Sequence, residues 1–412
     1  MALGPVLRIL ESKSRRYWLT AALVLAATVV LTPWVNERLN FDSLRYKLFE
    51  TMGVHSARKL EARFIKVVAV TNDDFVLDEP RGNSPINRHY LARIVDALRK
   101  ADVQLIALDF NLHIKDPHVT TTTVGDFSHI VNKEQVDALI RAVIAASGNN
   151  IKVILPKNIS GTGPYRLVPD IYQPYGICTK LVGDGRWANP GSPGFEIPAA
   201  AGRNITCGYI QLPYDERQVP PMLDIGTRGR IDSLSLAIAR AKNARAASAV
   251  GTSSAKFVTY LPASETESIS AGKLLKGDPD VIDTLRHNAV IVGGMWLSSD
   301  GQTLVDVHEA VTGKISGVLI HENFAEGILD GRLVTPLPEW VLLVVEVVAG
   351  IVFALLFAAV AEAWMKLLLL ALIAIVLLGA QWLIFALFGT FFEAFLPLLG
   401  LSLHSIIEKL LE

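Results

Sequence analysis

The stretch FIKVVAVT, at residues 64–71, is short, apolar and rich in β-branched side chains, and a polar Asn-Asp-Asp sequence follows it. This pattern predicts a buried β-strand. Two stretches of the same kind come later, QLIALDF at residues 104–110 and IKVIL at residues 151–155. Residues 87–100 and about 133–147 carry apolar side chains along one helix face. Strands that alternate with helices in this way predict an α/β layered domain with a mostly parallel sheet.

The second half of this domain is less regular in sequence. The region 156–221 holds 10 of the chain's 20 prolines, so we expect mostly loops there, with short strands near Cys207. Further along, strands are expected at residues 256–261 and 289–293, and helices at about 232–246 and 320–329.

Composition limits the class of protein. The 412 residues are more than one compact domain usually needs. Lys and Arg number 39 against 40 Asp and Glu, and this net charge of −1 argues against a nucleic-acid partner. Hydrophobic residues make up 51% and are concentrated in a few segments, so we expect a membrane-embedded protein with a large soluble part.

Residues 18–35 form an uncharged apolar stretch that follows several basic residues. A secretory signal peptide begins in the same way. No small-x-small cleavage site stands at the end of this stretch, however, and it ends in Thr-Pro-Trp. We therefore expect an uncleaved transmembrane helix at 18–35, with residues 1–17 in the cytoplasm.

Three more apolar segments of membrane-spanning length lie near the end of the chain, at residues 339–361, 367–388 and 391–411. The last of them contains a glutamate, a proline and a histidine, and an interfacial helix is the alternative for it. Four crossings place residues 36–338 outside the cytoplasm as one periplasmic domain. We therefore predict a multi-pass protein of a bacterial inner membrane, which is embedded in the lipid bilayer.

Two candidate ligand-binding groups follow strands of the predicted sheet. Asp73 or Asp74 ends the first strand, and Asp109 lies near the end of the second. Ligands of open parallel sheets bind outside the carboxyl ends of the strands, and two carboxylates there suit a cation, an amine or a hydroxyl. The alternative is that these aspartates accept backbone hydrogen bonds in their own loops.

A second candidate group lies around the final strand and helix and comprises Asp306, His308, His321 and Asn323. Carboxylate and imidazole side chains are ligands for zinc and related metals. No HExxH or paired CxxC spacing is present, and a histidine at a helix start also serves to fix a loop by hydrogen bonding. We expect a ligand-binding site here and no metal.

Signatures of catalysis are missing from the sequence. It has no GxxxxGK[ST] loop, no GxSxG elbow and no glycine-rich dinucleotide fingerprint. We expect no catalytic residues and no cofactor, and thus no enzyme.

Three further residues are singled out by their positions. Glu346 lies about six residues inside an apolar segment, where a carboxylate usually faces a bundle interior or a partner, although a position near the interface is the alternative. Cys178 and Cys207 both lie in the exported region, where either a disulfide or two buried thiols would fit.

Several segments together resemble the type-two CHASE domain, the extracellular sensory domain associated with bacterial cyclases and histidine kinases. They are KVVAVTNDDF at 66–75, INRHYLARIVDALRKADVQLIALDF at 86–110, AVIVGG at 289–294, DVH at 306–308 and GVLIHENFAEGILDGRL at 317–333. The last one is similar to the family's closing pattern Ile-His-Ala-Asn, with Glu322 in place of the alanine. Unlike many members of the family, this sequence does not continue into a cyclase or kinase, so we expect no cytoplasmic output domain.

The resemblance implies a sensor with an N-terminal anchor and about three membrane helices after the domain. We expect it to detect an unknown extracytoplasmic ligand and to pass the signal through these helices to a separate effector. The alternative is a structural or assembly subunit of an envelope complex, whose exported domain binds proteins. Oligomerisation is compatible with both hypotheses.

Overall fold

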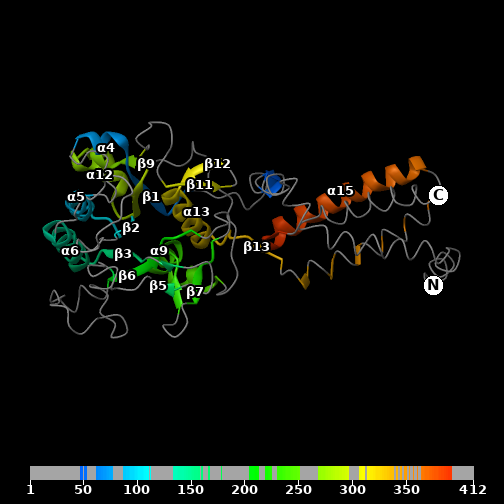
Figure 1. The fold of residues 1–412 in the computed structure, drawn as a ribbon, viewed down its shortest axis with the longest axis horizontal. Helices are drawn as coiled ribbons and strands as arrows, with labels where there is room; N and C mark the ends of the chain where they lie inside the picture. Colours follow the sequence, from blue (N-terminus) through cyan, green and yellow to red (C-terminus); the bar gives the residue numbers. More distant parts are fainter. Residues whose placement is uncertain are drawn as a thin grey trace, which may run out of the picture. The chain divides into compact units, whose positions relative to one another are not determined.

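The computed structural model of the 412-residue chain is described in two units, residues 59–333 and the remainder of the chain (Figure 1). Each unit is described by itself. The structure describes residues 47–49, 51–52, 62–77, 87–110, 112, 133–157, 159–160, 166–167, 178, 204–212, 219–224, 230–250, 268–296, 306–310, 313–337, 340–341, 344–345, 348–349, 352, 356, 360 and 363–391.

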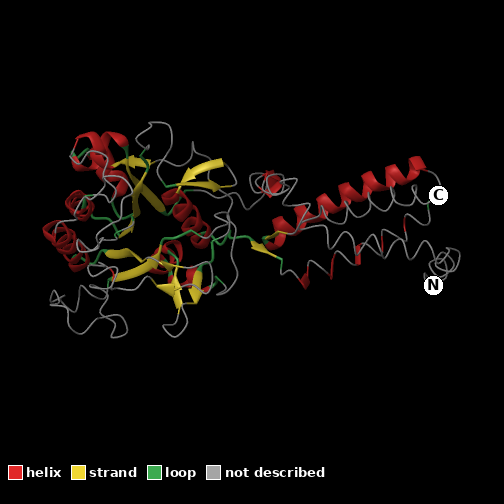
Figure 2. Cartoon of the chain, viewed as in Figure 1, coloured by secondary structure: helices red, strands yellow, loops and turns green. Residues whose placement is uncertain are grey.

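A six-stranded sheet, parallel throughout, forms the centre of the unit 59–333 (Figures 1 and 2). Its strand order is β6-β3-β2-β10-β1-β9. The strands are β1 (Ile65–Val70), β2 (Leu105–Asp109), β3 (Lys152–Lys157), β6 (Ile205–Tyr209), β9 (Ser268–Ser270) and β10 (Ala289–Gly294). The predicted α/β layered domain with a mostly parallel sheet is therefore confirmed.

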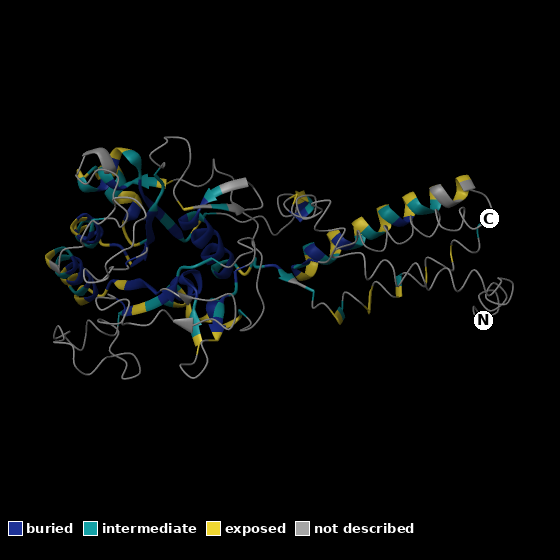
Figure 3. Ribbon diagram, viewed as in Figure 1, coloured by how far each residue is buried: buried dark blue, intermediate teal, exposed yellow. Residues whose placement is uncertain are grey.

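Alternation along the strands separates two cores on the two faces of the sheet. One core packs side chains such as Val68, Ile106 and Val290 against α5 (Arg88–Lys100) and α6 (Lys133–Gly148). The other packs Ile65, Ala107 and Ile291, among others, against α9 (Leu234–Lys242) and α13 (Gly317–Leu329). Both faces are thus covered, which explains why the central strands are almost continuously apolar (Figure 3).

The predicted positions of the elements are largely right in the first half of the domain. The helix expected at 232–246 is wrong as one piece, because Asn243 ends α9 and its side chain accepts hydrogen bonds from the first amides of α10 (Ala244–Ser248). The short strand expected near Cys207 is β6, which pairs with β3 at one edge of the central sheet. The strand expected at 256–261 lies outside the described residues.

Several short elements were not predicted. They are the helices α4 (Asn72–Leu77), α11 (Ala271–Leu275) and α12 (Pro279–Leu285) and the two-stranded sheets β4 (Ile159–Ser160) with β5 (Arg166–Leu167), β7 (Met222–Asp224) with β8 (Arg230–Asp232), and β11 (Val307–Ala310) with β12 (Gly313–Ser316). The edge strand β9 reads Ser-Ile-Ser and so lacks the apolar run that marks the other strands. These short, polar pieces carry too little periodicity to be seen in the sequence.

The other unit contains the helix α15 (Ala363–Phe388), whose segment Leu368–Phe388 is long and apolar enough to cross a membrane. Large apolar side chains along it, such as Leu368, Ile375 and Leu387, are more than half exposed (Figure 3). This is the single such helix among the described residues, so the expected number of three C-terminal spans stays a prediction.

In this unit, a short pair of parallel strands connects a segment before α15 with the residues that follow this helix. The strand β13 (Thr335–Pro336) pairs with β14 (Thr390–Phe391), which directly follows α15. Gly389 connects α15 to β14 and has the positive φ of 61° that favours glycine. The segment 18–35 and most of 339–361 and 391–411 lie outside the described residues.

Candidate functional site

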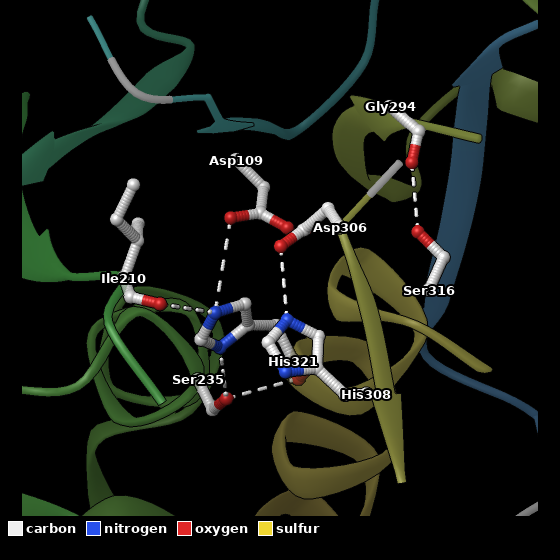
Figure 4. Close-up of polar contacts among 8 residues, drawn as sticks. All are labelled: Asp109, Ile210, Ser235, Gly294, Asp306, His308, Ser316 and His321. Carbon is white, nitrogen blue, oxygen red and sulfur yellow. Dashed lines mark hydrogen bonds and ion pairs between the residues drawn. The ribbon is translucent and has the colours of Figure 1, made fainter. Parts of the chain in front are cut away.

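The carboxyl ends of the parallel strands bring together polar groups from distant parts of the chain (Figure 4). Asp109 is the last residue of β2, and Ile210 directly follows β6. Ser235 lies in the first turn of α9, and His321 lies in the first half of α13. The loop before β11 adds one more carboxylate, which is described below. Two helices and two strand ends thus converge at the edge where parallel sheets bind ligands.

His321 is the centre of this cluster and is almost fully buried. Its Nε2 lies 3.1 Å from the carbonyl oxygen of Ile210 and 3.7 Å from Oδ1 of Asp109. Its Nδ1 lies 3.3 Å from Oγ of Ser235, whose hydroxyl is also 3.0 Å from the carbonyl oxygen of His321. Nε2 faces two acceptors, so this nitrogen carries the proton of the neutral ring, and the ring is held in one orientation.

Burial keeps both members of the His321–Asp109 pair uncharged. It lowers the pKa of His321 to about 4, although the Ile210 carbonyl and the charge of Asp306 act in the opposite direction. Burial also raises the pKa of Asp109 well above its usual value, and the nearby Asp306 adds to this effect while His308 opposes it. The contact is therefore one between neutral polar groups rather than an ion pair.

Asp306 and His308 form the more accessible part of the cluster. Nε2 of His308 lies 2.9 Å from Oδ1 of Asp306, and the Asp306 side chain is 53% exposed. Burial alone would raise the pKa of Asp306, but the hydrogen bond and charge of His308 outweigh it and lower this pKa below its usual value. A charged carboxylate thus lies beside the neutral His321–Asp109 pair, within reach of solvent.

A glycine at the start of α13 allows this loop to approach the helix. The amide of Gly317 donates to the carbonyl oxygen of Asp306 over 3.0 Å, and Asp306 has a positive φ of 62°. A Cβ at position 317 would overlap the Asp306 carboxylate and lie 3.2 Å from Nε2 of His308. Beside it, the hydroxyl of Ser316 donates to the carbonyl oxygen of Gly294 over 2.7 Å and so fixes the end of β10 (Figure 4).

Two aromatic rings follow the same strand ends. Phe110 comes directly after β2 and Trp296 two residues after β10, and their rings stack with centroids 6.4 Å apart. Phe110 is only 5% exposed, and both rings pack in the core on the α5 and α6 face of the sheet, not beside His321. The groups that the cluster offers to a ligand are therefore carboxylate and imidazole side chains, which suit a small polar or cationic ligand.

The first predicted group, Asp73, Asp74 and Asp109, is divided in the structure. Asp74 accepts hydrogen bonds from the amide and the hydroxyl of Thr71, over 2.7 and 3.0 Å, and from the hydroxyl of Ser270 over 3.5 Å. Asp73 is exposed on α4. Asp109 belongs instead to the second group with Asp306, His308 and His321. Asp74 has the local loop role that was the alternative for it.

The remaining predicted residues have mainly structural surroundings. The side-chain amide of Asn323 donates to the carbonyl oxygen of Leu319 within α13, over 2.6 Å. Cys178 and Cys207 form a disulfide with their Cα atoms 6.1 Å apart, which resolves the two alternatives for them. Glu346 lies outside the described residues.

Ser235, His321 and Asp109 together have the residue types of a hydrolase triad. Ser235 is only 1% exposed, however, and its hydroxyl lies against both the ring and the backbone carbonyl of His321. The contacts of Ser235 thus hold the ring of His321 in its orientation. Within the part of the chain that the structure describes, no group of three His, Cys, Asp or Glu side chains is arranged to hold a metal ion.

Sequence reasoning missed Ser235, the Ile210 carbonyl and Glu326. Ser235 interrupts an otherwise apolar helix start, LSLAIA, and this is the one sequence signal for it. The backbone carbonyl of Ile210 could not be singled out from the sequence, because every residue has a backbone carbonyl. Glu326 was hidden in an acidic series on α13 that resembles a solvent-exposed face.

The fold and the cluster define an α/β domain of the kind that presents a small polar site at the carboxyl edge of a parallel sheet. The CHASE2 domain model matches residues 21–361, so the chain belongs to the CHASE2 domain family, whose members are extracellular sensory domains. The predicted resemblance is therefore confirmed. Comparisons with curated proteins and with solved structures gave no match.

Proposed function

We propose that this chain is a membrane-anchored sensor, and not an enzyme, whose CHASE2 domain binds an extracytoplasmic ligand at Asp109, Asp306, His308 and His321. The observation that carries the proposal is the family match over residues 21–361, since the family is one of sensory domains. The cluster at the carboxyl edge of the sheet supports the position of the site.

Charge and exposure define the ligand's chemistry. The exposed and ionised Asp306 attracts a cationic or amine group, while the neutral Asp109 and His321 behind it supply hydrogen-bonding groups. A small amine-bearing metabolite fits this combination.

Signal transmission would proceed through α13. A ligand shifts an equilibrium only if it binds two arrangements of the domain with different affinity. His321 and Gly317 of α13 belong to the site, and the chain leaves the domain directly after this helix. The effector is a separate protein in this proposal, and Glu346 is the contact that we assign to it. Replacement of Glu346 by leucine is expected to reduce co-purification of that partner.

Topology is part of the same proposal. We place residues 1–17 and the C-terminus in the cytoplasm and the CHASE2 domain in the periplasm, as a multi-pass inner-membrane protein. Reporter fusions after residues 185 and 412 test it: the first should be active only outside the cytoplasm and the second only inside. The opposite pattern would overturn the proposed topology.

Ligand binding is tested by thermal shift on the full chain in detergent, screened against amines, amino acids and other small cations. A ligand in excess over its Kd raises the melting temperature by mass action. The shift should persist in Asp73→Asn, an exposed aspartate outside the cluster, and be lost in Asp306→Asn. The absence of any shift, together with a stoichiometric protein partner in pull-downs, would instead support an assembly subunit.

A further inference from the structure

The helix α13 buries two carboxylates that do not belong to the cluster around His321. Glu322 and Glu326 are one helical turn apart, and their exposed fractions are 2% and 0%. Such a pair is unusual, because a buried carboxylate normally has a cation or several hydrogen-bond donors as partners.

Glu326 holds the start of the first strand. Its Oε1 accepts hydrogen bonds from the backbone amides of Phe64 and Ile65, both over 2.7 Å, although these residues are far apart from it in sequence. The last helix of the domain is thereby fastened to the place where the first strand begins. Glu326 thus joins two elements of the same unit, the last described helix and the first strand of the sheet.

The other oxygens of the pair are not satisfied. Oε2 of Glu322 and Oε2 of Glu326 are buried and have no hydrogen-bond partner among the residues that the structure describes. Two ionised carboxylates here would repel each other, and the buried Oε2 of each would accept no hydrogen bond. Binding of a proton to one carboxylate removes one of the two charges and turns its oxygen into a hydrogen-bond donor. The pair is therefore suited to bind a proton.

We propose that Glu322 and Glu326 form a proton-binding site that fastens α13 to the start of β1 and makes the packing of these two elements respond to pH. Protonation removes the repulsion within the pair and tightens the contact. Ionisation of both side chains loosens it. The site is a second input, separate from the cluster at Asp109 and His321.

The surrounding charges agree with this proposal. Burial raises the pKa of Glu322 to about 8; the charge of Glu326 adds to the effect and that of Lys66 on β1 opposes it. Burial also raises the pKa of Glu326 to about 7, against the backbone hydrogen bonds from Phe64, Ile65 and Arg63, while the charge of Asp330 at the end of α13 raises it further. Lys242 on α9 is the other cation that faces Glu326. The pair therefore gains and loses protons near neutral pH.

The direction of the effect follows from these shifts. Both carboxyls have a higher pKa in the folded domain than in the unfolded chain, so the folded state binds protons more tightly. Their stabilisation is complete below the usual pKa of about 4.5 and is lost as the pH rises through about 7 to 8. The domain should consequently tighten on acidification and loosen in alkali.

The test uses the full chain in detergent and its melting temperature between pH 6 and 8.5. The wild type should lose about 5 °C over this range. The double variant Glu322→Gln with Glu326→Gln, whose amides imitate protonated carboxyls, should lose much less. The control Glu134→Gln, at an exposed glutamate of α6, should follow the wild type. Equal pH profiles for the wild type and the double variant would overturn the proposal.

Two further measurements keep the proposal falsifiable if the double variant does not fold. Infrared difference spectra of the wild type should show a protonated carboxyl band at pH 6 that disappears by pH 9 and is weakened in Glu322→Gln alone. Amide exchange at Phe64 and Ile65, corrected for the intrinsic effect of pH, should be slower at pH 6 than at pH 8.5. A missing carboxyl band, or equal protection at both pH values, would contradict the proton site.

Discussion

The helix α13 buries titratable groups of opposite kind, and the comparison shows how one helix can limit stability at both ends of the pH scale. The neutral ring of His321 has Ile210, Ser235 and Asp109 as partners. In the pair Glu322 and Glu326, Oε1 of Glu326 accepts two backbone amides, and Oε2 of each side chain is buried without a hydrogen-bond partner among the described residues. Acid must charge the histidine, and alkali must charge the carboxylates. The domain is therefore expected to be most stable between these two limits.

The largest effect on stability is expected from the carboxylate pair, on replacement of Glu326 by alanine. The amides of Phe64 and Ile65 lose their acceptor, and two poorly solvated donors without partners cost about 2–4 kcal/mol of unfolding free energy. Chemical denaturation at pH 6, where the carboxyl is uncharged, measures this loss without the effect of the buried charge. Glu134→Ala is the control and should change stability by less than about 0.5 kcal/mol. Equal losses in both variants would show that Glu326 does not hold β1.

The next largest effect concerns His321 and the stability of the domain in acid. The pKa of His321 is about 4 in the folded domain, below its usual value, so the folded state binds fewer protons than the unfolded chain. The stabilisation is present above pH 6.5 and is lost as the pH falls towards 4, by about 3 kcal/mol. Denaturation curves between pH 7 and 4 should be flatter for His321→Gln than for the wild type. An unchanged acid profile in this variant would assign the acid limit to another group.

A smaller effect is expected at the first residue of α13. In Gly317→Ala the new Cβ overlaps the Asp306 carboxylate, which must move away together with the loop that carries His308. Such overpacking costs about 1–2 kcal/mol. Gly148→Ala, at the end of α6 where nothing lies within 4 Å of the added carbon, is the matched control and should be near neutral. A neutral Gly317→Ala would show that the loop does not depend on this close approach.

The smallest effect separates the two aspartates after β1 from the α13 cluster. Asp74→Ala removes the acceptor for the amide of Thr71 and should cost about 1 kcal/mol, whereas Asp73→Ala at an exposed position should change stability by less than about 0.5 kcal/mol. Neither variant should alter the acid profile assigned to His321. A change of that profile in Asp74→Ala would mean that the two strand ends are coupled.

The residue types of the site were predictable, but their grouping was not. Asp109 was assigned to Asp73 and Asp74 because all of them follow early strands of the sequence. In the structure β10 lies between β1 and β2, so the end of β2 is separated from the end of β1. The helix α13, which follows β10 in the chain after β11 and β12, brings His321 to Asp109. Strand order depends on long-range pairing, which one sequence with local periodicity does not contain.

Glu326 shows a different limit of sequence reasoning. Glu322, Glu326 and Asp330 recur every four residues, which usually indicates the solvent side of a helix. Here α13 is buried nearly all round, and this acidic face contacts the start of β1. In the amphipathic helices α5 and α6, by contrast, the apolar face is the buried face, and Leu91, Ile94 and Leu139 are fully buried as predicted.

The central position of β10 has a consequence for how the protein is made. Ile65 pairs with Ala289, and Ala289 pairs in turn with Leu105, so the middle of the sheet is supplied by the strand that is synthesised last among the six. During synthesis, the early strands emerge with open, hydrogen-bonding edges that stay without their native neighbour until residues 289–294 follow. Folding is therefore expected to be slow and sensitive to truncation before residue 294.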